Sequence, residues 1–139
     1  MDQEPNSYTS ILAAARSAVE NAYAPYSNFK VGAAIATASG ETFTGCNIEN
    51  LSFGLTMCAE RAAVASAIAN GHRDLAAIAI VADSRRPPVP CGACRQVLAE
   101  FNPNLTIIAA TTDGQVEKFE LSKLLPAANQ GVLEGVRGV

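Results

Sequence analysis

The chain has 139 residues, with 13 acidic and 10 basic side chains and a formal net charge of −3. Its composition is 49% hydrophobic and 17% charged, so it can form a sizeable core, and its length predicts a single domain over residues 1–139, with the tail at about 126–139 unassigned. No basic run is present, and no apolar run reaches the roughly 18 residues of a membrane span, which excludes an electrostatic nucleic-acid site and a membrane partner.

The predicted elements run in the order helix, strand, strand, helix, strand, helix, strand, strand, helix. Helical periodicity and turn residues predict helices at 8–23, from a Thr56 cap to Asn70, over about ten residues ending near Asn102, and at 121–125. Strands are predicted at 31–37, 41–46, 75–82, 105–111 and 115–120, and the segments 24–29 and 47–56 are predicted loops.

The strands at 75–82 and 105–111 are apolar runs without polar alternation, which is typical of strands covered on both faces. Buried strands with helices between them favour an α/β fold. We therefore expect a three-layer α/β/α sandwich with a mixed sheet of about five strands.

Two cysteines three positions apart, Cys91 and Cys94, begin a predicted helix, so their sulfurs can grip one ion. By itself this pair is also compatible with a redox motif or half of a zinc ribbon. Cys58, near the start of another predicted helix, supplies a third thiolate. Three protein ligands leave the fourth position of a tetrahedral zinc open for water, which is the arrangement of a catalytic zinc.

The other possible ligands are less suited to the metal. His72 stands in a polar turn and is expected at the surface, and Cys46 ends a predicted strand and is expected to be a buried small residue. If either one were a fourth ligand, the site would be a closed structural zinc of an interaction module. The sequence alone leaves that alternative open.

Glu60 is too close to Cys58 in sequence to be an ordinary further ligand. A carboxylate beside zinc-bound water can take its proton and pass it to a substrate nitrogen. Zinc with three thiolates carries a net charge of −1, so a cation should offset the sulfurs. Arg61 and Arg95 directly follow the two cysteine motifs and could donate hydrogen bonds to sulfur, although both are also compatible with ordinary helix-surface positions.

The combination C-A-E and P-C-x-x-C is a signature of zinc nucleobase deaminases. The stretches YAPYSNFKVGAAI, FTGCNIEN, GLTMCAERAAV and PCGACRQVLAEF resemble cytidine deaminases of the small homotetrameric type, over about Tyr8 to Pro126. The resemblance implies a cytidine deaminase-like fold, one Zn²⁺ per chain, and active sites shared between subunits. It also implies hydrolytic deamination of cytidine and deoxycytidine to uridine and deoxyuridine in pyrimidine salvage.

The same resemblance implies a role for several further residues. Asn47 and Glu49 would hold the ribose hydroxyls, and Phe29 would pack against the pyrimidine, where a loop-anchoring role is an equal alternative. Ala59 and the Cys91 region would offer main-chain groups to the base, and Glu60 would contact N3 and the amino group.

Two positions depart from the family pattern. Phe53 stands where the family often has tyrosine, in a loop that reaches a neighbouring subunit's site. Asn129 lies near the place of a C-terminal aromatic that closes over the base, and the tail contains no aromatic residue. Stacking of about 1–3 kcal/mol is therefore missing or supplied elsewhere.

Two other enzyme classes are alternatives. A deaminase of a cytosine-containing antibiotic such as blasticidin S has similar zinc motifs, but Asn47 and Glu49 favour a ribonucleoside. Editing of a base in RNA or DNA is opposed by the acidic charge and the absence of a groove combining aromatic and basic residues. The absence of a secretory signal pattern and four expected thiols favour the cytoplasm.

Overall fold

The structure of the protein, a computed structural model, describes residues 4–130, with side chains from Tyr8 onward. Its helices are α1 (Glu4–Val19), α2 (Ala59–Ala69), α3 (Gly92–Phe101) and α4 (Leu121–Leu124), with a 3₁₀ turn η1 (Phe53–Leu55). Its strands are β1 (Val31–Thr37), β2 (Thr42–Cys46), β3 (Leu75–Ala82), β4 (Thr106–Thr111) and β5 (Val116–Glu120). The order of elements is the predicted one.

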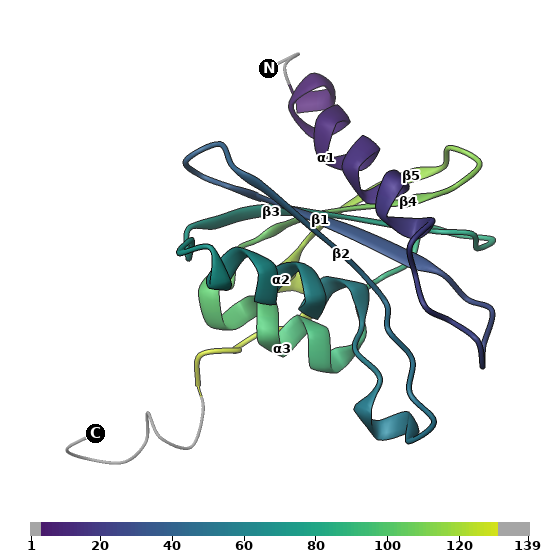
Figure 1. Ribbon diagram of the computed structural model, residues 1–139. Helices are drawn as coiled ribbons and strands as arrows, with labels where there is room; N and C mark the ends of the chain where they lie inside the picture. Colours follow the sequence, from purple (N-terminus) through teal and green to yellow (C-terminus); the bar gives the residue numbers. More distant parts are fainter. Residues whose placement is uncertain (1–3, 131–139) are drawn as a thin grey trace.

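The five strands form one mixed sheet in the order β2-β1-β3-β4-β5. Only β3 and β4 pair in parallel, and the other neighbours pair antiparallel. A parallel pair needs a crossover connection, which α3 supplies between β3 and β4. Helix α1 covers one face of the sheet, and α2 and α3 cover the other (Figure 1). This confirms the predicted three-layer α/β/α fold.

The two faces of β3 carry side chains of different size. Ile78 and Ile80 pack in the core beneath α2 and α3, whereas Ala77, Ala79 and Val81 pack in the core beneath α1. Side chains alternate between the faces of a strand, so an apolar run of this kind serves two cores at once. The alternation in this strand is one of size rather than of polarity.

The first helix begins and ends earlier than predicted, since α1 covers Glu4–Val19 instead of 8–23. The chain leaves the helix because Tyr23 pairs with a segment far along the sequence. Its main-chain N–H donates to Asn47 O over 2.9 Å, and its carbonyl accepts from Glu49 N over 2.9 Å. These tertiary hydrogen bonds replace those of a last helical turn.

The predicted helix cap at Thr56 is also wrong, because the N-cap residue of α2 is Cys58. The predicted strands agree with the observed ones to within a residue at each end. Residues 131–139 of the predicted tail lie outside the described part of the chain. None of the helices within residues 4–130 has the length and apolar character that a membrane span requires.

Candidate active site

Three cysteines meet where α2 and α3 begin. Cys58 and Cys91 are the N-cap residues of these helices, and Cys94 lies buried in the first turn of α3. Their sulfur atoms all lie within 4.8 Å of one another. Within the described residues, this is the single group of three or more histidine, cysteine or acidic side chains placed to hold a metal ion.

The sulfur cluster fits zinc. Tetrahedral zinc with bonds of about 2.3 Å needs sulfurs about 3.8 Å apart, which the cluster allows. Burial, and next the charge of Glu60, raise the pKa of the Cys94 thiol well above its ordinary value. A thiolate at this position therefore needs a cation, and the positive ends of two helix dipoles supply only part of that charge.

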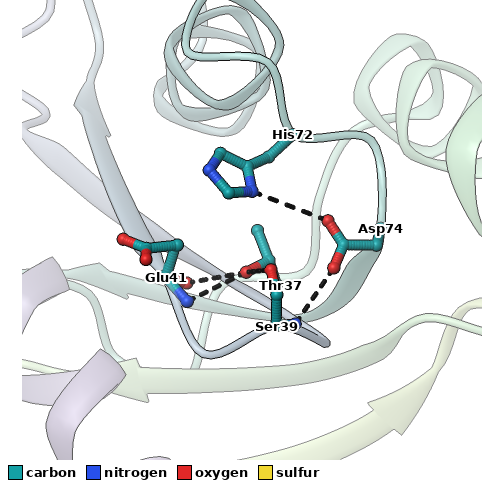
Figure 2. A network of polar contacts seen from close by, with 5 residues as sticks. All are labelled: Thr37, Ser39, Glu41, His72 and Asp74. Carbon is teal, nitrogen blue, oxygen red and sulfur yellow. Dashed lines mark hydrogen bonds and ion pairs between the residues drawn. The ribbon is translucent and has the colours of Figure 1, made fainter.

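Cys46 and His72 do not belong to the cluster. Cys46 ends β2 and is half-buried, where full burial was expected. His72 follows the far end of α2, and its Nδ1 lies 3.8 Å from Asp74 Oδ1 (Figure 2). Its ring lies 5.1 Å from that of Phe43. His72 is half-buried rather than a surface residue. The described structure thus offers no support for a closed structural site using either residue.

Glu60 lies in the first turn of α2, two residues after Cys58, and is only 6% exposed. Burial raises the pKa of its carboxyl, while hydrogen bonding that involves its own backbone and Cys94, and the charge of Arg61, act in the opposite direction. A carboxyl with a raised pKa exchanges protons more readily near neutral pH than an exposed glutamate does.

Arg61 contacts the sulfur cluster directly. Its Nη2 donates to Cys58 Sγ over 3.4 Å and to the Thr56 carbonyl over 3.3 Å. Its Nε is buried and finds no hydrogen-bond partner among the described residues. The geometry places a cationic group against one of the three sulfurs, as charge compensation requires.

Arg95 makes different contacts. Its Nε donates to Pro90 O over 2.7 Å, and its Nη1 donates to Leu124 O over 3.0 Å. These hydrogen bonds tie the start of α3 to the end of α4. They go to main-chain carbonyls, so compensation of thiolate charge by Arg95 stays a prediction.

Asn47 is buried and holds two segments together through its amide. Its Nδ2 donates to Phe29 O over 2.7 Å, and its Oδ1 accepts from Val31 N over 2.9 Å. Each amide atom retains one further hydrogen-bonding position for a ligand. Asn47 therefore fixes the loop that carries Phe29, whose own side chain is 42% exposed.

Glu49 is held by the tip of the same loop. Its Oε1 accepts from Tyr26 N over 2.9 Å and from Ser27 N over 3.1 Å, and its Oε2 accepts from the Ser27 hydroxyl. The hydroxyl of Ser27 has the largest effect and lowers the pKa of the Glu49 carboxyl; burial opposes it, and each of the two main-chain donors lowers the pKa by a smaller amount. Glu49 is consequently a carboxylate at neutral pH.

A cleft of about 270 Å³ opens beside this carboxylate. It is lined by Tyr26, Ser27, Glu49, Phe53 and Thr56. The Phe53 ring is 73% exposed and meets the Tyr26 ring edge-on at 5.8 Å. The Thr56 carbonyl accepts from Arg61, which also contacts Cys58, so one arginine side chain links a residue of the cleft wall to the sulfur cluster.

Of the remaining predicted site residues, Ala59 is buried at the first position of α2, and Asn129 is exposed in a turn after α4. Sequence reasoning treats Tyr26 and Ser27 only as loop residues and therefore misses their part in the cleft. A run of turn-forming residues marks the loop, but no local pattern pairs it with a carboxylate 22 positions away.

Comparison with known proteins agrees with a zinc site formed by the three cysteines. Residues 5–110 match the family model of the cytidine and deoxycytidylate deaminase zinc-binding region. The cytidine deaminase of Halalkalibacterium halodurans is 51% identical over 110 residues, covering 78% of this chain and 83% of that protein. The crystal structure of cytidine deaminase from Burkholderia pseudomallei superposes with a TM-score of 0.82 at 50% identity, over 85% of this chain and 95% of that one.

A more distant relative is the blasticidin-S deaminase of Bacillus cereus, 33% identical over 104 residues, which cover 69% of this chain and 74% of that protein. The family model spans both helix starts and all three clustered cysteines. Identity of about one half to cytidine deaminases extends over most of the chain. The chain belongs to the cytidine and deoxycytidylate deaminase family, and Cys58, Cys91 and Cys94 lie in its zinc-binding region.

Proposed function

We propose that the protein is a zinc-dependent cytidine deaminase that converts cytidine and 2′-deoxycytidine to uridine and 2′-deoxyuridine with release of ammonia. One observation carries the proposal: a three-sulfur cluster with a buried carboxyl, Glu60, beside it, linked through Arg61 and Thr56 to a cleft that contains a second carboxylate. The similarity to cytidine deaminases over most of the chain supports the same activity.

Cys58, Cys91 and Cys94 would hold the zinc, whose Lewis acidity would make water nucleophilic near neutral pH. Glu60 takes a proton from the attacking water and delivers it to N3 of the cytosine ring as the new C4–O bond forms. The same carboxylate then takes the remaining proton from the new C4–OH group and passes it to the amino group, so that C4=O forms, the C4–N bond breaks, and ammonia leaves. Burial of Glu60 supports this relay because it favours the neutral carboxyl that must form midway.

The nucleoside would bind through residues of loops 24–29 and 47–57 and of the starts of α2 and α3. Glu49 and Asn47 would bind the ribose hydroxyls, Phe29 would pack against the pyrimidine, and the main chain at Ala59 and Cys91 would contact the base. The fixed amide of Asn47 and the ionised carboxylate of Glu49 support these roles, because a diol needs both donors and acceptors in set positions.

We also propose a homotetramer in which neighbouring subunits complete each active site. Loop 47–57 exposes several large apolar side chains, among them Leu51 at 79%, Phe53 at 73% and Leu55 at 72%. Several exposed large apolar side chains within one loop support an interface with another protein chain. Phe53 lines the cleft, so a subunit that covers it would also cover the substrate.

All four cysteines are free thiols in the described structure. Zinc binding needs three of them reduced, which favours a reducing compartment. The cytoplasm is therefore the proposed location.

The test follows ammonia release from cytidine, deoxycytidine and blasticidin S while zinc per chain is measured. We expect release from both nucleosides and about one zinc per chain. Glu60→Gln should keep the zinc and abolish turnover, because an amide cannot relay the proton. The similarity to a blasticidin-S deaminase makes the antibiotic a necessary comparison. Release from blasticidin S alone would reassign the substrate, and substantial activity of Glu60→Gln would remove Glu60 from the relay.

A further inference from the structure

We propose that Ser27 is a positioning residue that fixes the Glu49 carboxylate so that one acceptor position of its Oε2 stays open for a ribose hydroxyl. The inference rests on the proposed function, since it concerns how the same cleft holds a nucleoside. It adds a residue from loop 24–29 whose contact with Glu49 is visible only in the folded chain.

The acceptor positions of Glu49 are nearly all in use. A carboxylate offers about four lone-pair positions, two on each oxygen. Oε1 accepts from two main-chain donors, Tyr26 N at 2.9 Å and Ser27 N at 3.1 Å. Among the residues that the structure describes, Oε2 accepts only from the Ser27 hydroxyl. One position on Oε2 therefore remains, and Glu49 is among the residues that line the cleft.

The direction of the Ser27 hydroxyl is determined by a second hydrogen bond. Its oxygen accepts from Phe29 N over 3.0 Å, while its own hydrogen goes to Glu49, which as a carboxylate can only accept. The Ser27 hydroxyl thus links Glu49, which is proposed to bind the ribose, to the main chain of Phe29, which is proposed to contact the pyrimidine. Both groups are set before any substrate enters, which reduces the cost of ordering them on binding.

Within the loop the hydroxyl holds only Phe29 N, and the other hydrogen bonds that dock the loop do not involve it. Tyr23 N donates to Asn47 O, Glu49 N donates to Tyr23 O, and Asn47 Nδ2 donates to Phe29 O. The two Oε1 contacts also come from main-chain N–H groups, which a side-chain substitution leaves in place. Removing the Ser27 hydroxyl should therefore release Oε2 without undocking the loop.

The experiment compares the unmodified chain with Ser27→Ala, using KM and kcat for cytidine and the inhibition constants of uridine and 2′,3′-dideoxyuridine. A hydrogen bond to a charged group is worth roughly a factor of ten in binding. We expect Ser27→Ala to raise KM for cytidine and the inhibition constant of uridine about tenfold. The dideoxynucleoside lacks the 2′- and 3′-hydroxyls, so its inhibition constant should change less than about twofold. The kcat for cytidine should change little.

Two further variants separate positioning from a general loss of structure. Ser27→Thr keeps a hydroxyl and should restore uridine binding. Ser39→Ala removes an equivalent exposed serine hydroxyl from the β1–β2 turn, at the far end of α2, and should change neither constant (Figure 2). All variants should retain the zinc content and Tm of the unmodified chain.

An equal rise in both inhibition constants in Ser27→Ala, or no rise in either, would overturn the role of Ser27. Failure of Ser27→Thr to restore uridine binding would count against it as well. The proposed function has a separate readout, because the unmodified chain must release ammonia from cytidine. If the unmodified chain is active but Ser27→Ala raises both inhibition constants equally, the proposed deaminase activity is retained and only the positioning role of Ser27 is rejected.

Discussion

The two ends of α2 carry similar side chains in opposite environments. At its start, the Glu60 carboxyl is 6% exposed, and the nearby Arg61 Nε is buried with no hydrogen-bond partner among the described residues. Beyond its end, the exposed Asp74 carboxylate accepts from Ser39 N over 3.0 Å and lies 3.8 Å from His72 (Figure 2). Burial raises the pKa of Glu60, whereas hydrogen bonds from Ser39 lower that of Asp74.

The difference separates a reactive site from a structural one. A hydrogen-bonded, solvated carboxylate such as that of Asp74 stabilises a turn and keeps its charge. Buried groups with incomplete pairing are costly, and they persist where chemistry or a missing ligand gives them a role. The groups at the start of α2 are buried and incompletely paired, and the neighbouring sulfur cluster gives them a chemical role.

The largest effect should come from removing a sulfur at the start of α2. Cys58→Ala should abolish zinc binding and turnover and lower Tm, because two remaining sulfurs cannot hold the metal and bound metal stabilises the fold. Metal analysis, ammonia release and thermal unfolding would check this. Cys46→Ala is the matched control and should keep zinc and activity, since Cys46 is outside the cluster. Loss of zinc from Cys46→Ala would instead support a closed structural site.

A smaller effect is expected from moving the start of α2 without touching its side chains. A Cβ at Gly45 would lie 2.4 Å from Ala63 N and 2.6 Å from Ala59 O, so Gly45→Ala must displace the first turn. We expect a loss of about 1–3 kcal/mol in the free energy of unfolding from overpacking, with kcat reduced about tenfold or more because misplacing reacting groups by about 1 Å is costly.

Gly71, just beyond the end of α2, provides the matched comparison. Its φ is +87°, and a Cβ added there would meet no atom within 4 Å, so Gly71→Ala introduces backbone strain of about 1–2 kcal/mol but no collision. Its kcat should equal that of the unmodified chain. Denaturant unfolding and steady-state kinetics would check both variants, and equal losses of kcat would contradict the distinction between the two ends.

The smallest effect concerns Asp74 and pH. Its pKa lies below the ordinary value of 3.8, so its contribution to stability is present above that value and is lost as pH falls through the lower folded-state pKa. Asp74→Asn should therefore lower Tm slightly at neutral pH, and the difference from the unmodified chain should shrink at pH values below about 4. Activity at neutral pH should be unchanged. A difference in Tm that grows on acidification would show that the sign is wrong.

The amino-acid sequence by itself determined the order of the elements and the metal chemistry. The runs at 75–82 and 105–111 are typical of strands in a sheet covered on both faces, which the structure forms from them. Cys91 and Cys94 are brought together by the geometry of one helical turn. These are local patterns, so they can be recognised without the fold.

Only the tertiary structure decided how distant groups meet. The first helix ends at Val19 because Tyr23 pairs with residues 47–49, and Glu49 is fixed by Ser27, 22 positions away. The burial of Glu60 likewise depends on the packing of α2 against the sheet. Hydrogen bonds and burial between segments remote in sequence follow from packing, and no spacing along the chain encodes them.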